Sequence, residues 1–246
     1  MLAALRDADV VACEDTRHTR RLLERHGIDA RLVSYHEHNE RTRARQLVER
    51  MRSGEVVALV SDSGTPGISD PGFVLVRACI EAGLEVEVLP GPSSAMTALV
   101  ASGLPPDRWR FTGFLPRRKG ELRRELERAG ETLVAFESPN RLGATLALLA
   151  EIDPERPVAV CRELTKLHEQ VVRGSARELA RRFADGARGE VVLVIGAAAD
   201  AGEADPAAAL EAVERLVEVG ARRRAAASVV SSLTGVPANR LYRGGG

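Results

Sequence analysis

The chain has few lysines, cysteines and aromatic residues, and each shortage narrows what the protein can be. Aromatic residues make up 3% of its 246 residues, and Lys119 and Lys166 are its only lysines, so nearly all positive charge is on arginine. The 35 basic residues balance 35 acidic ones, so net charge alone does not indicate a nucleic-acid partner. Because the whole composition is rich in alanine and arginine, total arginine content indicates no function.

The three cysteines exclude two classes of small protein. Cys13, Cys79 and Cys161 are odd in number, widely spaced, and lie in or beside apolar runs. They fit neither a disulfide framework nor a metal site, and we expect buried free thiols in a reducing cytoplasm. No apolar run approaches the roughly eighteen residues that a membrane span needs, and no signal peptide leads the chain. We therefore expect a cytoplasmic protein with no membrane partner and no metal.

Short runs of β-branched residues alternate with longer helical patterns along the chain. Buried strands are predicted at residues 10–13, 56–60, 86–89, 132–136, 158–161 and 191–195. Amphipathic helices are predicted at residues 41–52, 71–82 and 93–102. This alternation predicts an α/β fold with a largely parallel sheet.

Two composition breaks divide the chain. A glycine followed by two prolines interrupts any helix at residues 103–107, and an Ala/Gly/Asp/Pro stretch follows residue 197. We predict four parts: an α/β domain at 1–104, a second α/β domain at 105–197, a linker at 198–206 and a small basic helical domain at 207–246.

The segment at residues 60–72 follows a predicted strand and precedes a predicted helix. In parallel α/β sheets ligands bind at the carboxyl ends of strands, which places a site here. Gly64 lets the backbone approach a ligand closely, and the Asp62 carboxylate can accept hydrogen bonds from ribose hydroxyls or an amino group. The simpler interpretation is a loop with a helix cap, in which Ser69 or Asp70 is the N-cap and Pro71 takes the first helical position. That interpretation leaves residues 62–66 unexplained.

A second loop, at residues 89–95, joins another predicted strand to a helix. Ser93 and Ser94 lie at the N-terminus of that helix, where free amides and hydroxyls receive polar ligands. Taken alone, a Pro-Gly-Pro-Ser sequence is a common turn and cap. Two such loops at neighbouring strand ends make a stronger case for a ligand site.

These two loops resemble the cofactor-binding pair of the tetrapyrrole-methylase superfamily. Five further segments are similar to its ribosomal RNA branch, the small-subunit methyltransferase I family: residues 12–20, 36–39, 113–116, 136–142 and 161–166. The resemblance runs continuously from about residue 5 to residue 196 and more loosely through the tail. It implies a two-domain tetrapyrrole-methylase-like fold, here with a small helical C-terminal domain, and S-adenosylmethionine folded into the cleft between the α/β domains.

The resemblance also implies an activity and a cofactor site. The activity is S-adenosylmethionine-dependent 2′-O-methylation of a cytidine ribose in the 16S RNA of the small ribosomal subunit. Implied cofactor contacts are Asp62, Gly64, Thr65, Pro66 and Ile68 on one wall and Ser93 and Ser94 on another. Backbone near Phe136 and Ala197 would close the adenine side.

Methyl transfer to a ribose hydroxyl requires in-line alignment and removal of the hydroxyl proton. Candidate proton acceptors are Glu14, Asp15 and Glu137, and Arg17 and Arg141 are candidates for holding phosphate. An alternative for Glu14 and Asp15 stays open at this point: they could be the charged N-terminal turn of the helix that follows, favourable to its dipole.

The N-terminus departs from the family pattern. Members begin with a strand and a Thr-Pro-Ile-Gly-Asn-Leu-type loop, whereas residues 2–9 here have the pattern of a helix end followed at once by a strand. We expect the first strand to be missing because the start was assigned too late. The alternative is a truncated relative.

Local excess of basic residues predicts where RNA binds. Arg117, Arg118 and Lys119 belong to one such cluster, and Arg222, Arg223 and Arg224 belong to a tail with no acid after Glu218. We expect phosphate contacts from both, with a solvated helix face as the alternative for the first. The expected partners are the small ribosomal subunit with its 16S RNA and a second copy of the chain in a homodimer.

Two other functions remain possible on sequence alone. One is a methyltransferase for a tetrapyrrole small molecule, which would share the fold but leaves the segments at residues 14–19 and 162–166 and the basic tail unexplained. The other is a non-catalytic RNA-binding relative that does not bind the cofactor. Cofactor titration tests for the non-catalytic relative, which would not bind S-adenosylmethionine. A methyl-transfer assay that compares small ribosomal subunits with a porphyrinoid tests for the tetrapyrrole methyltransferase.

Overall fold

The computed structural model describes residues 1–62, 64–128, 130–198 and 206–243. They form two compact units, one from Met1–Arg128 with Thr132–Gly196 and the other containing the C-terminal helices. Most of the predicted linker, residues 199–205, lies outside the described residues.

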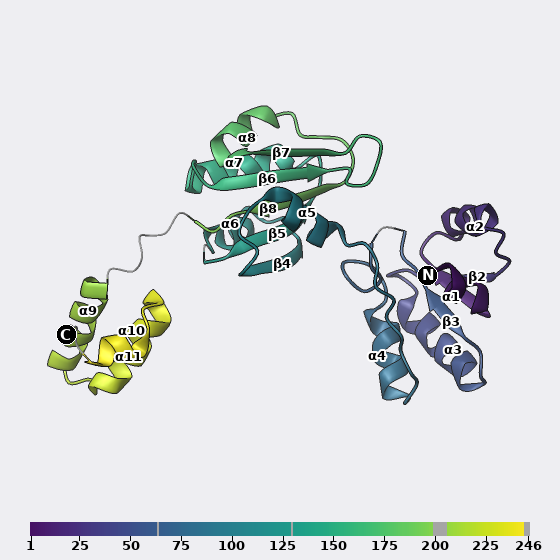
Figure 1. Cartoon of the computed structure of the whole chain (residues 1–246), viewed down its shortest axis with the longest axis horizontal. Coiled ribbons are helices and arrows are strands. Elements are labelled where there is room, and N and C mark those ends of the chain that lie inside the picture. The colour runs from purple at the N-terminus through teal and green to yellow at the C-terminus, as the bar shows by residue number, and fades with distance from the viewer. Residues whose placement is uncertain (63, 129, 199–205, 244–246) are drawn as a thin grey trace. The chain divides into compact units, whose positions relative to one another are not determined.

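A three-stranded parallel sheet forms the first part of the larger unit (Figure 1). Its elements are α1 (Leu2–Asp7), β1 (Val10–Cys13), α2 (Thr16–Arg25), β2 (Arg31–Ser34), α3 (Glu40–Arg52), β3 (Val57–Leu59) and α4 (Phe73–Glu81), with strand order β2-β1-β3. Every residue of β1 is buried, because Val10 and Ala12 pack in one apolar cluster with α3 and α4 while Val11 packs in another with α1 and α2. A strand covered on both faces is continuously apolar, which is why it was predictable.

A five-stranded sheet forms the rest of the larger unit (Figure 1). Its elements are α5 (Ser94–Ser102), β4 (Trp109–Phe114), α6 (Lys119–Glu127), β5 (Thr132–Glu137), α7 (Leu142–Ile152), β6 (Pro157–Arg162), β7 (Gln170–Ser175), α8 (Ala176–Arg182) and β8 (Val191–Ile195), with strand order β4-β5-β8-β6-β7. The helices α6, α7 and α8 pack on one face and α5 packs on the other, since alternate residues of β5, β6 and β8 enter two separate apolar clusters.

The second sheet is mixed, so the prediction of a largely parallel sheet is right for the first sheet and wrong for this one. Of its four strand pairings, that of β4 with β5 is parallel, whereas β8 pairs antiparallel with both β5 and β6, and β7 pairs antiparallel with β6. Apolar periodicity marks a strand but carries no information about its direction. The strands β2, β4 and β7 were not predicted because polar residues interrupt their apolar runs, whereas the equally half-buried β3 lies in an uninterrupted apolar run.

Residues 86–89 do not form the predicted strand. They have no regular secondary structure, and Val88 is 75% exposed. Alternation of valine with Glu85 and Glu87 gives this segment strand propensity, but propensity becomes a strand only when a neighbouring strand satisfies the backbone. The following helix, α5, falls in the predicted first domain at residues 1–104, yet its Ala95, Ala98 and Leu99 pack against the five-stranded sheet.

The C-terminal unit is a small three-helix cluster of α9 (Pro206–Glu218), α10 (Arg223–Thr234) and α11 (Ala238–Arg243). Val213, Ala226, Val230 and Leu241 form its own apolar core, and Gly235 ends α10 in the left-handed region at φ 75°. None of the helices within the described ranges is both long and apolar enough to cross a membrane.

Candidate active site

Three loops follow the carboxyl ends of the parallel strands β1, β2 and β3. The backbone of Tyr35 after β2 donates to the carbonyl of Cys13 at 2.8 Å, and that of Val60 after β3 donates to the carbonyl of Ala12 at 2.9 Å. Glu14, the first residue after the central strand β1, is therefore flanked by the loops that follow both neighbouring strands. This is the edge at which open parallel sheets bind ligands.

The Glu14 carboxyl has a raised proton affinity. Burial raises its pKa above the ordinary value of 4.5, and the nearby Asp70 and Asp62 carboxylates raise it further. A backbone hydrogen bond from Asp62 acts in the opposite direction. A half-buried carboxylate with a raised pKa is a better proton acceptor than an exposed one. Of the predicted bases, Glu14 is the one that the structure places beside the 60–72 loop.

Asp15 has a structural role that the sequence left open. It is the N-cap of α2, and its carboxylate accepts a hydrogen bond from the Arg17 backbone at 2.8 Å. That bond, followed by the bond from the Arg17 side chain, lowers the pKa of Asp15. The Arg17 side chain is 87% exposed and lies 3.4 Å from the Asp15 carboxylate. The interpretation of Asp15 as part of the charged N-terminal turn of α2 is thus confirmed, with the added finding that it is the N-cap.

The loop at residues 60–72 closes on itself before α4 begins. The N-cap of α4 is Gly72, so the prediction that Ser69 or Asp70 caps this helix is wrong. The backbone of Gly72 adopts φ 155°, and a Cβ there would lie 2.8 Å from the Gly67 nitrogen, so the chain turns too tightly for helix to start earlier. Asp70 instead points inward: one carboxylate oxygen is buried with no hydrogen-bond partner among the residues that the structure describes, and burial raises its pKa.

The predicted cofactor residues of the 60–72 loop differ in exposure and in chemical type. Asp62, Gly64 and Ile68 are exposed, and Thr65 and Pro66 are half-buried; Ser63 between them lies outside the described residues. A Cβ on Gly64, whose φ is 92°, would meet nothing within 4 Å, so space is open above this backbone. The Ile68 side chain is 52% exposed. A carboxylate, an accessible backbone and an apolar side chain together suit a ligand with hydroxyl, amino and apolar parts.

Ser93 and Ser94 lie at the start of α5, as predicted. Ser93 is the N-cap, and its hydroxyl accepts a hydrogen bond from the Met96 backbone at 3.5 Å. Both serines are half-buried, and the first-turn amides of α5 are donors for a polar ligand. Phe136 on β5 and Ala197 after β8, predicted near the adenine, are half-buried as well.

Glu137 is buried at the end of β5, with 0% of its side chain exposed. One oxygen accepts from the Ser138 backbone at 2.6 Å, and the other accepts from the Thr145 hydroxyl at 2.6 Å and lies 3.4 Å from the Arg141 guanidinium. Each oxygen is thus engaged inside the protein. In this arrangement Glu137 presents no surface to a substrate hydroxyl.

Arg141 connects Glu137 to the loop that follows β4. Its guanidinium donates to the carbonyls of Leu115 at 3.3 Å and Pro116 at 2.6 Å, just after β4 ends. We call Glu137, Arg141 and Thr145 the Glu137 brace. Because it holds the chain immediately before residues 117–119, the brace fixes where that basic segment starts.

Both basic clusters lie at helix N-termini. Arg118 is the N-cap of α6, and Arg222 that of α10, in each case without a side-chain cap. Cations at a helix N-terminus oppose the helix dipole at a cost of roughly 0.3–1 kcal/mol each. Helix stability therefore does not explain these residues, whereas a phosphate at the same place gains from both the dipole and the charge. The Arg118 guanidinium forms an ion pair with the Glu121 carboxylate at 3.2 Å, and the Arg223 guanidinium forms one with the Glu214 carboxylate at 3.8 Å.

Two of the segments that carry the family resemblance, residues 36–39 and 161–166, have local structures that the sequence did not predict. In the loop after β2, the Asn39 side chain accepts from the His36 backbone at 3.0 Å and donates to the Ser34 carbonyl at 3.2 Å, which fixes the turn. In the loop after β6, Glu163 and Thr165 adopt left-handed φ values of 51° and 67°. Strained backbone of this kind is frequent at functional sites. The available signal for the first was Asn39, three residues after His36 in the loop that follows β2.

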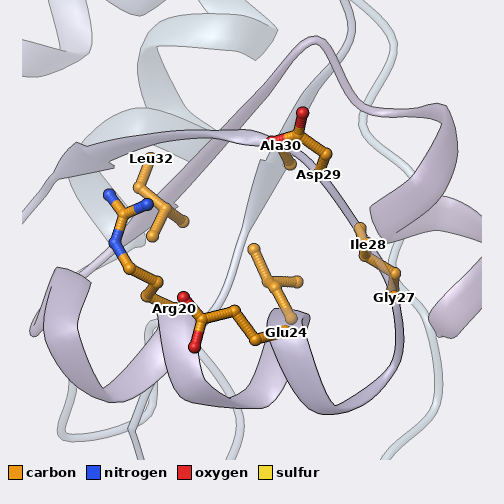
Figure 2. A pocket seen from close by; sticks show the side chains of 8 residues that line it. Arg20, Glu24, Gly27, Ile28, Asp29, Ala30 and Leu32 are labelled. Atoms are coloured by element: carbon orange, nitrogen blue, oxygen red, sulfur yellow. The ribbon is translucent and has the colours of Figure 1, made fainter.

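A hollow of about 290 Å³ lies elsewhere, between α2 and the start of β2 (Figure 2). Arg20 and Glu24 on α2 line it together with residues 27–30, the segment that leads into β2 (Figure 2). It is at the amino end of the parallel strands, opposite the loops described above. None of the predicted site residues lines it.

Comparison with known proteins identifies the family of the chain. Residues 1–180 match the family Tetrapyrrole (Corrin/Porphyrin) Methylases. The chain belongs to the tetrapyrrole methylases.

Two curated relatives of this methylase carry the name Ribosomal RNA small subunit methyltransferase I. The protein of Micromonospora olivasterospora is 44% identical over 247 residues, covering 98% of the methylase and 79% of that protein. The protein of Mycobacterium tuberculosis strain H37Rv is 46% identical over 250 residues, covering 98% and 87%. Among solved structures, uroporphyrin-III-C-methyltransferase from Thermus thermophilus has a TM-score of 0.56 at 26% identity, covering 79% of the methylase and 85% of that chain. The predicted α/β tetrapyrrole-methylase-like fold is confirmed.

Proposed function

We propose that this methylase transfers a methyl group from S-adenosylmethionine to the 2′-hydroxyl of a cytidine ribose in the 16S RNA of the small ribosomal subunit. The observation that carries the proposal is similarity over 98% of the chain to relatives named as small-subunit ribosomal RNA methyltransferases. The basic clusters at the starts of α6 and α10 support an RNA substrate, because their charges fit phosphate and disfavour the helices that carry them.

The 60–72 loop fits the cofactor that the family uses. Asp62 would accept hydrogen bonds from its hydroxyl or amino groups, the open backbone at Gly64 would allow close approach, and Ile68 would cover apolar surface. Ser93 and Ser94 would offer hydroxyls and amides at the start of α5. The bound cofactor would supply an electrophilic methyl group.

Asp62→Ala should weaken binding of S-adenosylhomocysteine by about 5- to 150-fold, the range for losing a hydrogen bond worth roughly 1–3 kcal/mol with a charged partner. Calorimetry measures this, with circular dichroism to verify the fold. Asp29→Ala is the matched control, since Asp29 is an exposed aspartate at the hollow beside β2. Unchanged affinity in Asp62→Ala would show that the 60–72 loop is not the cofactor wall.

Glu14 would accept the proton of the ribose hydroxyl as the oxygen attacks. Its position between the loops after β2 and β3 puts it at the ligand-binding edge of the sheet, and burial keeps its carboxyl from full hydration. Arg17, exposed beside the adjacent Asp15, would contact a neighbouring phosphate. Asp15 would hold Arg17 and the start of α2 in place.

The rate of methyl transfer should fall on acidification, with the acid limb above pH 4.5, because a base must be deprotonated and the pKa of Glu14 is raised from that value. The Asp70 carboxylate is one cause of the raised pKa, so Asp70→Asn should move the acid limb of kcat/KM to lower pH. A pH–rate profile of both proteins tests this. An identical limb in Asp70→Asn would remove Glu14 as the titrating base.

The function itself is tested with two acceptors. Radiolabelled methyl transfer from S-adenosylmethionine should proceed to unmethylated small subunits and not to a porphyrinoid. Transfer to the porphyrinoid alone would make the chain a small-molecule methyltransferase, and failure to bind cofactor would make it a non-catalytic relative. The cytoplasmic location stays a prediction, as does the homodimer, which sedimentation would test.

A further inference from the structure

Phe114 is an aromatic side chain left open to solvent at the end of β4. It is 62% exposed, although its ring contacts Phe136 edge to face at a centroid distance of 5.5 Å. Phe136 in turn contacts Phe111 at 5.0 Å, so Phe114 rests on a packed aromatic base. An aromatic ring supported from beneath and open above is the arrangement on which a nucleobase stacks.

The backbone on both sides of this ring is fixed. Gly113 precedes it at φ 66°, and the Leu115 backbone after it donates to the carbonyl of Phe136 at 3.1 Å while the Leu115 side chain is buried. The Glu137 brace then holds the Leu115 and Pro116 carbonyls through Arg141. A ring held this firmly loses little conformational entropy when a ligand covers it.

The positive charges at residues 117–119, just after Phe114, favour RNA over the cofactor as the ligand of this surface. Arg117, Arg118 and Lys119 are all exposed, and Arg118 lies at the N-terminus of α6, where the helix dipole adds to its charge. S-adenosylmethionine carries a sulfonium, an ammonium and one carboxylate, so it is a net cation that this cluster of cations does not favour. An RNA strand brings one phosphate per nucleotide, and these cations attract it.

We propose that Phe114 with residues 117–119, which we call the Phe114 platform, binds an unpaired base of the substrate RNA, the ring by stacking and the cations by contact with the flanking phosphates. The proposal rests on the proposed function, since it names the part of this methylase that holds the RNA beside the reacting nucleotide. Stacking tolerates any base, so the platform holds the strand without reading its sequence.

The test measures binding of a fluorescein-labelled oligocytidine by anisotropy. Phe114→Ala should weaken binding about tenfold, which is ~1.4 kcal/mol. Phe114→Leu keeps apolar contact with Phe136 but removes the aromatic face, so it should weaken oligocytidine binding to a similar extent. Phe114→Tyr keeps the aromatic face and should bind oligocytidine as the wild type does. Leu167→Ala is the control, because Leu167 is 92% exposed in the same unit. Affinity for S-adenosylhomocysteine should stay unchanged in all of them.

Two results would overturn the proposal. If Phe114→Leu binds oligocytidine as wild type does while Arg117→Ala binds weakly, the segment contacts phosphates only. If Phe114→Ala loses cofactor affinity instead, the ring belongs to the cofactor site. A wild-type chain that binds oligocytidine through Phe114 but methylates no small subunit would contradict the proposed function and leave the platform standing.

Discussion

Deleting residues 207–246 should weaken binding to the small ribosomal subunit by one to two orders of magnitude and flatten its dependence on salt, while cofactor affinity stays nearly unchanged. The arginines at the start of α10 and Arg240 on α11 would contact phosphates, and each such contact releases counterions and steepens the salt dependence. A tethered domain adds affinity through its high effective concentration without shaping the catalytic residues.

Full-length variants test the same point without truncation. Replacing Arg222, Arg223 and Arg224 with alanine should reproduce most of the loss in filter-binding titrations at several salt concentrations. Replacing Glu211 and Glu218 of α9 with glutamine is the control and should not weaken binding. If deletion abolishes cofactor binding but not RNA binding, the tail is structural. A change of sedimentation on deletion would indicate a dimer contact instead.

Glu137→Leu should lower the free energy of unfolding by about 3–5 kcal/mol, the cost of removing one partner from a buried ion pair. Arg141, with 29% of its side chain exposed, would lose its carboxylate, and the buried Thr145 hydroxyl would lose its acceptor. Glu137→Gln keeps an acceptor for Thr145 and should cost less. Urea denaturation measures both, and the small-subunit KM should rise with the loss of the brace.

An exposed ion pair in the same unit provides the comparison. Arg123 on α6 lies 3.4 Å from Glu127, with about half of each side chain exposed, and Glu127→Leu should change stability by less than about 1 kcal/mol. Equal stability of Glu137→Leu and wild type would show that the brace is dispensable for folding. A lower kcat at unchanged stability and KM would return Glu137 to the catalytic candidates.

The sequence predicted best the strands whose residues are buried, and therefore apolar, at every position. The strand Val10–Cys13 is apolar at every position because helices cover both of its faces, and Val191–Ile195 is apolar because it is the central strand of its sheet. The direction of the second strand could not be predicted, since antiparallel and parallel central strands bury the same residues. Val88 has strand propensity without a neighbour to pair with.

The candidate site was predictable in outline and not in detail. The loops after β1 and β3 follow from topology, because parallel strands bring their carboxyl ends to one edge. The separate environments of Glu14 and Asp15 do not follow, because they depend on which carboxylate faces the 60–72 loop and which caps α2. The burial of Glu137 does not follow from the sequence either, because a buried carboxylate needs partners. Its partners, Thr145 and Arg141, are identified only by the structure.

The position of β8 has a consequence for how the chain is made. This strand is the last of its sheet to be synthesised, yet it lies between β5 and β6 and pairs with both. Until Val191–Ile195 has left the ribosome, β4 with β5 and β6 with β7 are separate two-stranded pieces, which are marginally stable alone. The nascent chain therefore carries two unpaired strand edges late into synthesis, a period of exposure to aggregation that ends only when the central strand inserts.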